Sequence, residues 1–496
     1  MATIYEKEVV FDKLDETFER LKRYIYDAAD HEELHEVEQQ IFRKVQEIGR
    51  QSLECFVCLS GSGYEEGNPP VSDEGIQMRY KGTVHSPYMS IFGEIKIARA
   101  AYQHPMGGYV YPIDATLNLP AHKYSYLLEK WLQASACESD FRSTVDRFNE
   151  IFDFSFSPEV PQRLGLSVGG DVERFYEECA PVDADTEGSH IAVSADCKGV
   201  RILRSERADL KEPLQGPRLG KGEKAGIKKD AVVVTDFSFD PEARDPEEVV
   251  KGLLNQFTQE EKQQQAPQGI PKPREALNKH VFASLQGKKE AFDHMIGHLL
   301  KRAPEKPLIA LLDGDPYLED RLHKQLSAYG LQERLDALIL DIIHVSERLW
   351  EVGTALHGEK GVKRIQWVER SLYMLLEGKV GYLIGALKQM VSKGKKRQVK
   401  VIEKTITYFE NHRHMMAYHI YLKKGYPIAT GLVEGACGSL VKDRMEHSGM
   451  RWSIKGAQAV LSQRAVMLNG DWDAFWEYYI ETETQRLYPT VYKRVA

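Results

Sequence analysis

The sequence predicts a mixed α/β fold, and two apolar patterns together with their order indicate it. Pro307–Asp313 (PLIALLD) is continuously apolar, as a strand covered on both faces must be. Ser189–Asp196 (SHIAVSAD) carries alternating apolar residues and also ends on an aspartate. Helical periods separate the later apolar runs, which gives the order β-β-β-α-β-α-β. That order is typical of a mixed sheet with helical crossovers.

Length and composition allow several packed regions, but they do not indicate which partners the chain binds. The chain has 496 residues, 42% of them hydrophobic, which is ample for more than one core. The formal net charge of -8 does not indicate a nucleic-acid partner, so any such binding must come from local basic patches. Two patches exist, Arg201–Lys229 and Lys393–Lys404, although a basic loop is usually solvated surface.

The cellular setting is expected to be the cytosol. No apolar run approaches the roughly 20 residues that cross a bilayer, and the first residues lack the basic flank and apolar core of a signal peptide. The six cysteines are scattered without two close pairs, so we expect reduced thiols and no zinc site.

The N-terminal third is expected to hold helices around a small β unit. Phe11–Leu59 has the spacing of a long helix or helix pair for packing or dimerisation, and Arg79–Tyr111 contains short strand-like runs. Ala121–Tyr176 then predicts three short helices. Their tight joints are compatible with a helix-turn-helix DNA reader, and equally with ordinary helical packing.

The central sheet is expected to contain five strands. A hairpin is predicted at Cys197-Lys198, and a helix is predicted over Arg274–Lys301. The gln-rich stretch EEKQQQAPQ is expected to be an exposed loop. The five expected strands are Ser189–Asp196, Gly199–Arg204, Ala231–Phe237, Pro307–Asp313 and Asp336–Val345, the last with Asp341 and His344 at or beyond its end.

The C-terminal third is predicted to be helical. Glu347–Lys424 has helical period almost throughout, and Asp471–Tyr479 (DWDAFWEYY) is expected to pack in a core. Between them, Thr430 is an acceptable N-cap for a helix ending near Ser448-Gly449.

The helix that begins near Thr430 carries one carboxylate among small residues. Val433, Cys437, Leu440 and Val441 would form its buried stripe, with Glu434 at the edge. Its three glycines, at 431, 435 and 438, each cost roughly 1 kcal/mol relative to alanine. Either something large, such as a nucleic-acid backbone, approaches this surface, or the helix packs closely on a sheet.

Three carboxylates, Asp196, Asp313 and Glu434, are expected to meet at the rim of one sheet, where open α/β folds bind ligands. Three acidic side chains suit Mg²⁺ or Mn²⁺ as hard oxygen ligands. Two such ions about 3.5–4 Å apart support in-line phosphodiester displacement. Without cations the carboxylates would repel one another, so we expect partial protonation. A single aspartate at a strand end is usually structural, and Asp315 is an alternative second ligand.

Four segments carry a resemblance to a known family. SADCKGV around Asp196, LLDGD around Asp313, LDIIHVSERLW around Asp341 and His344, and PIATGLVEGACGSLVKDRM followed by GMRW resemble the ISKra-type bacterial insertion-sequence transposases. The resemblance runs from roughly Tyr88 to the C-terminus. It implies a DDE enzyme with an RNase H-like catalytic core and an all-helical insertion, preceded by N-terminal helical and small β elements.

The resemblance also implies roles for individual residues. Asp196, Asp313 and Glu434 would be the catalytic and metal-binding triad. Asp341 and His344 would support the site or contact the transposon end, and a histidine just past an apolar strand is also commonly a hydrogen-bonded rim residue. Arg444, Arg451 and Trp452 would hold DNA or brace the active site, and the basic segment with Lys395, Lys396 and Arg397 would bind phosphates.

These expectations combine into one hypothesis with two rivals. The chain would be a cytoplasmic, nucleoid-associated bacterial transposase that uses two Mg²⁺ or Mn²⁺ ions, binds transposon-end and target DNA, and forms a homodimer or higher oligomer. The rivals are a metal-dependent nuclease that cuts without joining, and a transposase-derived DNA-binding protein without catalysis. The expected regions are 1–60 helical, 61–120 small β unit, 121–185 DNA-binding helices, 186–346 first part of the core, 347–424 insertion and 425–496 last part of the core.

Overall fold

The structure of the chain is a computed structural model that describes residues 10–71, 75–209, 228–259, 276–302, 305–359, 361–392 and 396–489; the side chains of residues 207–209, 255–259, 396 and 448 are outside that description. The chain forms two compact units, Met1–Val168 with Trp472–Ala496, and Gly169–Asp471. Among the described residues, no helix combines the length and apolar character needed to span a bilayer.

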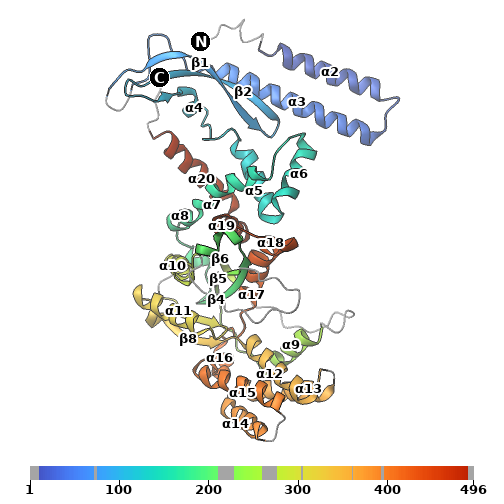
Figure 1. Ribbon diagram of the computed structural model, residues 1–496, viewed down its shortest axis with the longest axis vertical. Coiled ribbons are helices and arrows are strands. Elements are labelled where there is room, and N and C mark those ends of the chain that lie inside the picture. Colours follow the sequence, from blue (N-terminus) through green and yellow to red (C-terminus); the bar gives the residue numbers. More distant parts are fainter. Residues whose placement is uncertain are drawn as a thin grey trace. The chain divides into compact units, whose positions relative to one another are not determined.

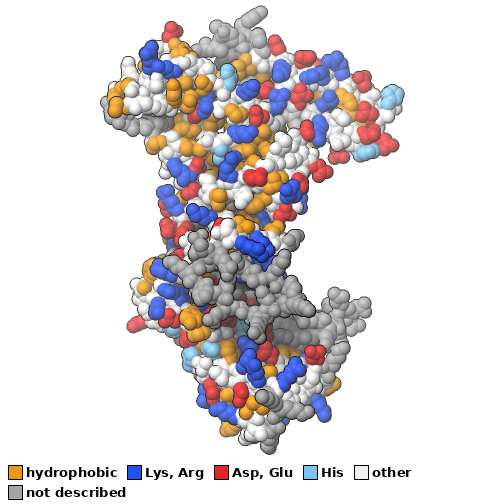
Figure 2. All heavy atoms as spheres, viewed as in Figure 1, with side chains coloured by type: hydrophobic (Ala, Val, Ile, Leu, Met, Phe, Trp, Pro, Cys, Tyr) orange, Lys and Arg blue, Asp and Glu red, His pale blue; other side chains and the backbone are white. Residues whose placement is uncertain are grey.

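The first unit begins with a helix pair and a small antiparallel sheet, as the sequence predicts. Helices α2 (Asp12–Ala28) and α3 (Leu34–Ser60) lie side by side (Figure 1). Strands β1 (Arg79–Ser90), β2 (Gly93–Gln103) and β3 (Tyr109–Val110) pair in that order. On the face seen in Figure 2, acidic and basic side chains are interspersed over α2 and α3, so no single sign of charge dominates there.

Short helices complete the first unit. After α4 (Pro112–Thr116), the three predicted helices are α5 (Tyr126–Glu138), α6 (Phe141–Phe152) and α7 (Glu159–Gly170). Leu128, Leu132, Val145, Phe148 and Leu164 form their shared core. The last helix, α20 (Trp472–Leu487), buries Phe475, Trp476 and Tyr479, which confirms the expected core packing of the aromatic C-terminal segment.

The second unit is built on a mixed five-stranded sheet, which confirms the mixed sheet with helical crossovers. Its strands are β4 (His190–Arg201), β5 (Lys228–Phe239), β6 (Leu277–Ser284), β7 (Leu308–Leu312) and β8 (Leu335–Leu340), in the spatial order β6-β5-β4-β7-β8. The first three strands pair antiparallel, and β4, β7 and β8 pair parallel. Crossover helices α10 (Lys288–Leu299) and α11 (Pro316–Ala328) precede β7 and β8 (Figure 1).

Three local predictions about this sheet are wrong. No hairpin forms at Cys197-Lys198, because β4 runs on to Arg201 and its last residues pair with the start of β5. The expected helix over Arg274–Lys301 is a strand, β6, followed by α10 after Gly287, because β5 takes β6 as its outer partner. The fifth strand ends at Leu340 and not at Val345; Asp341 and His344 lie beyond its end, as expected, and His344 is on the following helix.

Side chains cover both edges of this sheet. On β6, Asn469 and Gln458 of α19 (Ile454–Asn469) hydrogen-bond to the backbone of Val281, Ala283 and Leu285. On β8, the hydroxyls of two tyrosines of α16 (Tyr418–Lys424) donate to backbone carbonyls. Polar groups at a strand edge would otherwise invite pairing with another chain, so these contacts close the sheet.

A buried ionic network fastens β5 to α10 and the loop after it. The Arg302 guanidinium donates to Asp236 at 2.5 Å and to Glu187, and all three side chains are at most 1% exposed. His298 pairs with the same aspartate at 2.8 Å. Burial raises the pKa of Asp236, but His298 and Arg302 outweigh it, and the pKa falls to about 2. The carboxylate is therefore held ionised inside the unit.

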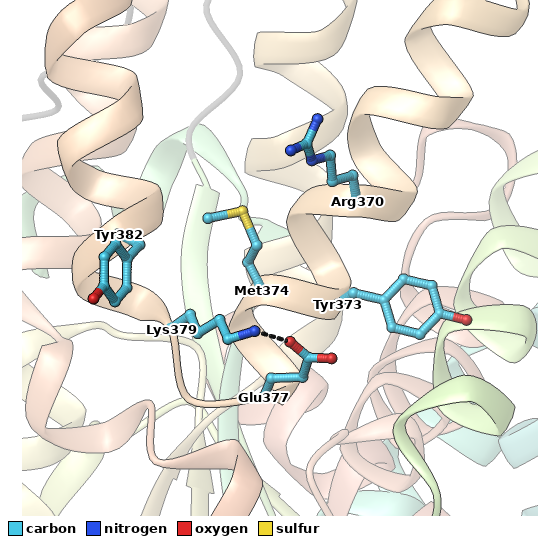
Figure 3. Close-up of a pocket in the computed structure, with 6 residues that line it drawn as sticks. All are labelled: Arg370, Tyr373, Met374, Glu377, Lys379 and Tyr382. Atoms are coloured by element: carbon cyan, nitrogen blue, oxygen red, sulfur yellow. Dashed lines mark hydrogen bonds and ion pairs between the residues drawn. The ribbon is translucent and has the colours of Figure 1, made fainter.

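Helices fill the segment between β8 and the Glu434 region, as predicted. They are α12 (Ile342–His357), α13 (Val362–Leu376), α14 (Val380–Val391), α15 (Lys396–Asn411) and α16, while α8 (Val172–Glu178) and α9 (Pro246–Gln259) lie elsewhere in the unit. Figure 3 shows a surface hollow at the junction of α13 and α14, where Lys379 pairs with Glu377. The hollow contains none of the predicted site residues.

Some predicted segments lie outside the described residues. These are most of the basic loop Arg201–Lys229, the gln-rich stretch and Lys395, together with the side chain of Lys396. All six cysteines are free thiols, as expected.

Candidate functional site

Three parallel strands bring three aspartates to one level of the sheet. Ala195 of β4 pairs with Leu312 of β7, which pairs in turn with Leu340 of β8. Asp196, Asp313 and Asp341 are the residues that directly follow these three. The Asp341 N–H donates to the Leu312 carbonyl at 2.9 Å, which locks the level of the last two. The register of the sheet therefore gathers acidic residues that are far apart in the sequence.

Asp196 lies inside its strand and not at its end, contrary to expectation. Its pairing partner on the antiparallel side is Val233 of β5, and β4 continues with β5 for five more residues, to Arg201. On the other side, pairing with β7 stops at Ala195. Asp196 thus lies one residue past the end of the β4–β7 pairing, at the rim of the sheet on that side.

Asp313 opens a tight turn whose shape depends on Gly314. The Asp315 N–H donates to the Asp313 carboxylate at 2.8 Å, and Gly314 has a φ of +91°, which favours glycine. Tyr408 of α15 donates its hydroxyl to the Asp313 carbonyl at 2.7 Å. The turn is therefore held from the helical segment as well as from the sheet.

Asp315, the alternative second ligand, has other partners. Its carboxylate accepts the Tyr317 N–H as the N-cap of α11 and pairs with Lys288 at 2.5 Å. Asp313 is the residue level with Asp196 on the neighbouring strand, so the structure favours Asp313 as the member of the cluster.

Glu434 lies on α17 (Gly431–Ala436), which continues through a π-helical segment, Cys437–Lys442, into α18 (Asp443–Met445). The predicted stripe of Val433, Cys437, Leu440 and Val441 is buried. Thr430 precedes the helix as predicted, but its side chain accepts no hydrogen bond from the helix's N–H groups, and its hydroxyl instead donates to Asp341. The helix start is thereby tied directly to the end of β8.

The three glycines of this helix do not serve close packing. A methyl group placed at residue 431, 435 or 438 would meet no other atom within 4 Å. The sequence left two explanations for these glycines, close packing on the sheet or the approach of a large ligand. The open space at the three positions argues against close packing. Among the described residues, no side chain covers the surface beside Glu434 at these three glycines.

The π-helical turn brings a thiol to the cluster. Single π-helical turns inside α-helices are frequently found at functional sites. Here Cys437 donates its thiol to the Asp196 carboxylate at 3.4 Å. Burial and then the charge of Asp196 raise the pKa of Cys437, so the thiol keeps its proton. Arg464 of α19 donates to the carbonyls of Ser439 and Leu440, which satisfies backbone groups of the π-helical turn.

In the part of the chain that the structure describes, Asp341, His344 and Glu434 form a close group of potential metal ligands. One ligand atom from each lies within 4.8 Å of the others. His344 Nε2 is 4.0 Å from the Glu434 carboxylate, and its Nδ1 is 3.2 Å from Glu347. Asp341 is fully buried and caps α12 by accepting the Ile343 N–H at 2.8 Å.

The carboxylates hold their protons more tightly than usual. Burial raises the pKa of Asp313, Asp341 and Glu434, and neighbouring acidic groups add to it at Asp313 and Glu434. Burial alone would lower the pKa of His344, but Asp341, Glu347 and Asp313 raise it. These directions agree with the expected repulsion within a cluster of acidic groups that lacks a cation.

The donor set fits divalent cations. Carboxylate oxygens are the ligands that Mg²⁺ and Mn²⁺ take, and they come here from three strands and a helix that converge on one rim. Burial is the largest cause of the raised pKa values of Asp313, Asp341 and Glu434, and acidic neighbours add to it at Asp313 and Glu434; a bound cation would favour the ionised form of each carboxylate.

The residues of the signature block fall into two groups. Arg444 is 1% exposed and Trp452 6%, and the guanidinium lies over the indole ring, 4.6 Å from its centroid. The Trp452 backbone bonds to Arg201 and Leu203 at the end of β4. Neither side chain offers surface to DNA in this conformation, so the bracing role fits both. Arg451 and Arg397 are exposed.

Sequence reasoning missed two contributors, Tyr408 and Glu347. Tyr408 lies in a helix with ordinary apolar spacing, and no sequence signal marks it. Glu347 follows His344 by three residues on α12, so helical spacing would have placed the two side chains together if the helix had been predicted there.

The chain matches no family in a scan against protein-family models, and a search of curated proteins finds no match.

Proposed function

We propose that the second unit is the RNase H-like catalytic core of a DDE transposase, with Asp196, Asp313 and Glu434 as its triad. One observation carries the proposal: the two aspartates are level on adjacent parallel strands, and the charge of Asp196 contributes to the raised pKa of both Asp313 and Glu434. The mixed sheet, with three antiparallel strands followed by two parallel ones, is a suitable frame for such a core.

The uncovered glycine surface supports a large ligand at this site. A DNA backbone needs close access to the carboxylates, and residues 431, 435 and 438 leave that access free. Exposed Arg451 and Arg397 would supply positive charge for phosphates. The helices α12 to α16 would be the insertion before the final glutamate, and the α2 and α3 pair would serve dimerisation.

Two bound Mg²⁺ or Mn²⁺ ions would lower the pKa of an attacking water or hydroxyl and stabilise the leaving oxygen. The protein's part is to place the ligands. Asp196 and Asp313 are fixed by strand register, and Glu434 by the helix that Thr430 ties to Asp341. In the first step, water attacks the phosphodiester at the transposon end and a 3′-hydroxyl leaves. In the second, that hydroxyl attacks target DNA and displaces a target 3′-hydroxyl.

The test compares the wild type with Glu434→Gln on labelled DNA fragments that flank the gene, with Mn²⁺ or Mg²⁺. The matched control is Glu446→Gln, which removes a carboxylate later in the same helical stretch. The proposal expects cutting and joining by the wild type and the control, and DNA binding without either reaction by Glu434→Gln.

Other outcomes reject the proposal in distinct ways. Cutting without joining by the wild type points to a metal-dependent nuclease. Binding without any reaction by the wild type points to a DNA-binding protein that lacks catalysis. Equal reaction by wild type and Glu434→Gln rejects the assignment of Glu434 itself.

A further inference from the structure

A mixed nitrogen and oxygen donor set stands beside the three triad carboxylates. Asp341 is the N-cap of α12, His344 lies in the first turn of that helix, and Glu434 comes from α17. Since residues three apart share a helix face, the first turn of α12 presents both of its ligands on one side. The three ligand atoms lie within 4.8 Å of one another, so small side-chain movements would bring them around one ion.

His344 has the arrangement of a metal ligand. Its Nδ1 is 3.2 Å from the Glu347 carboxylate, so the proton of the neutral ring belongs on Nδ1 and the lone pair on Nε2. Metal-bound histidines typically donate their other ring N–H to a carboxylate in this way. The Nε2 atom faces Glu434 at 4.0 Å, which is too long for a hydrogen bond.

The distance suits an ion between the two groups. Two ligands that bind one ion at about 2.1 Å lie roughly 3 Å apart, so closure needs an approach of about 1 Å. The Glu434 carboxylate has no hydrogen bond within the described part of the chain, so it is free to move. The glycines at 431, 435 and 438 place no side chain beside it, and a methyl group at any of them would meet no packed atom within 4 Å.

Asp341 is the fixed member of the group. Its carboxylate is held by the Ile343 N–H and by Thr430, and a carboxylate has about four lone-pair sites, so acceptor capacity remains for an ion. Such outer partners orient a ligand before the metal arrives. The acidic groups around the histidine, Asp313 and Glu347, add negative charge that favours a dication.

We propose that Asp341, His344 and Glu434 form a metal site for a first-row transition dication such as Mn²⁺, in preference to Mg²⁺. The preference follows from the imidazole, because Mg²⁺ takes oxygen ligands and keeps its waters, whereas transition dications accept ring nitrogen. The ion's part in catalysis rests on the proposed function, in which Glu434 would be shared with the site at Asp196 and Asp313. Its binding does not.

The test is pulsed electron paramagnetic resonance of Mn²⁺ added to the full chain without DNA, which detects a directly bound ¹⁴N nucleus. The main variant is His344→Gln. The matched control is His414→Gln, because His414 also pairs with a carboxylate, Glu319, but at a hydrogen-bond distance of 2.9 Å. Glu347→Gln is a second variant, which keeps the imidazole but removes the carboxylate that orients it and adds negative charge beside it.

The wild type and His414→Gln are expected to show nitrogen coupling that His344→Gln lacks. Mn²⁺ affinity should fall about 10-fold to 100-fold in His344→Gln and less in Glu347→Gln, with Mg²⁺ affinity changed less than about twofold. Bound Mn²⁺ without nitrogen coupling overturns the inference. The absence of Mn²⁺ binding overturns it as well, and so does an equal Mn²⁺ affinity of the wild type and His344→Gln. Circular dichroism of each variant confirms folding.

The DNA assay separates this inference from the proposed function. Metal-dependent cutting and joining without nitrogen coupling rejects the site at His344 and leaves the transposase proposal standing. Nitrogen coupling in a protein that neither cuts nor joins retains the metal site and rejects the transposase proposal.

Discussion

Replacing Tyr408 with phenylalanine tests how the helical segment supports the cluster. The Tyr408 hydroxyl donates to the Asp313 carbonyl at 2.7 Å, and its ring lies against Gly314, where a methyl group would approach it to 3.1 Å. The change removes one hydrogen bond and keeps the ring. A carbonyl left without a partner in a half-buried turn should cost about 1–3 kcal/mol of unfolding free energy.

The effect on the proposed reaction should be larger than the effect on binding. Asp313 would keep its place in the register, but its turn would lose the contact that fixes its direction. A ligand misplaced by about 1 Å can cost on the order of 100-fold in rate. We therefore expect Tyr408→Phe to slow DNA cutting by about 10-fold to 100-fold, with the DNA dissociation constant unchanged.

The assays are single-turnover cutting of end-labelled DNA, DNA binding by fluorescence anisotropy, and urea denaturation. Tyr421→Phe is the matched control, since its hydroxyl donates to the Leu338 carbonyl at 3.3 Å, two residues before the strand end. The control should lose stability without a comparable loss of rate. Equal rates for wild type and Tyr408→Phe, or equal losses for both variants, would refute a positioning role.

Two further predictions concern the interior of the second unit. Arg302→Met leaves Glu187 buried without a cation and leaves Asp236 with His298 alone, so the free energy of unfolding should fall by about 3–5 kcal/mol. Urea denaturation with hydrogen exchange of β5 measures the loss, and a loss below about 1 kcal/mol contradicts the prediction. Burial and then His298 lower the pKa of His294 to about 3, so His294 is neutral in the fold and protonates near pH 6.5 when unfolded. Its contribution is complete above pH 6.5 and should fall by about 1.4 kcal/mol per unit between pH 6.5 and 3. Thermal melts across this range should be flatter for His294→Gln, and an unchanged slope contradicts the prediction.

Local sequence patterns predicted many of the elements correctly. The apolar run of β7, the stripe of the Glu434 helix, and the helices between β8 and that helix depend on nearest neighbours along the chain, so periodicity was enough to find them. The aspartates that follow apolar runs also stood out, because a charge directly after a buried strand must lie at its rim.

Predictions failed where distant pairing decides conformation. Cys197-Lys198 has the composition of a corner, but pairing with the start of β5 keeps β4 extended. Leu277–Ser284 was expected to be helical, and it is a strand because β5 offers it an open edge. β-structure depends on partners far along the chain, so local propensity is a weak guide there.

The candidate site divides along the same line. The sequence by itself determined which acidic residues follow or interrupt apolar segments. It thereby identified Asp196, Asp313, Asp341 and Glu434 as the candidate site residues. Only the tertiary structure decided that three of them are level on β4, β7 and β8 and that His344 turns its Nε2 toward Glu434. Strand register and helix docking depend on contacts between distant segments of the chain. These contacts set the distances between the acidic side chains, and those distances decide whether a metal ion or a phosphodiester can bind.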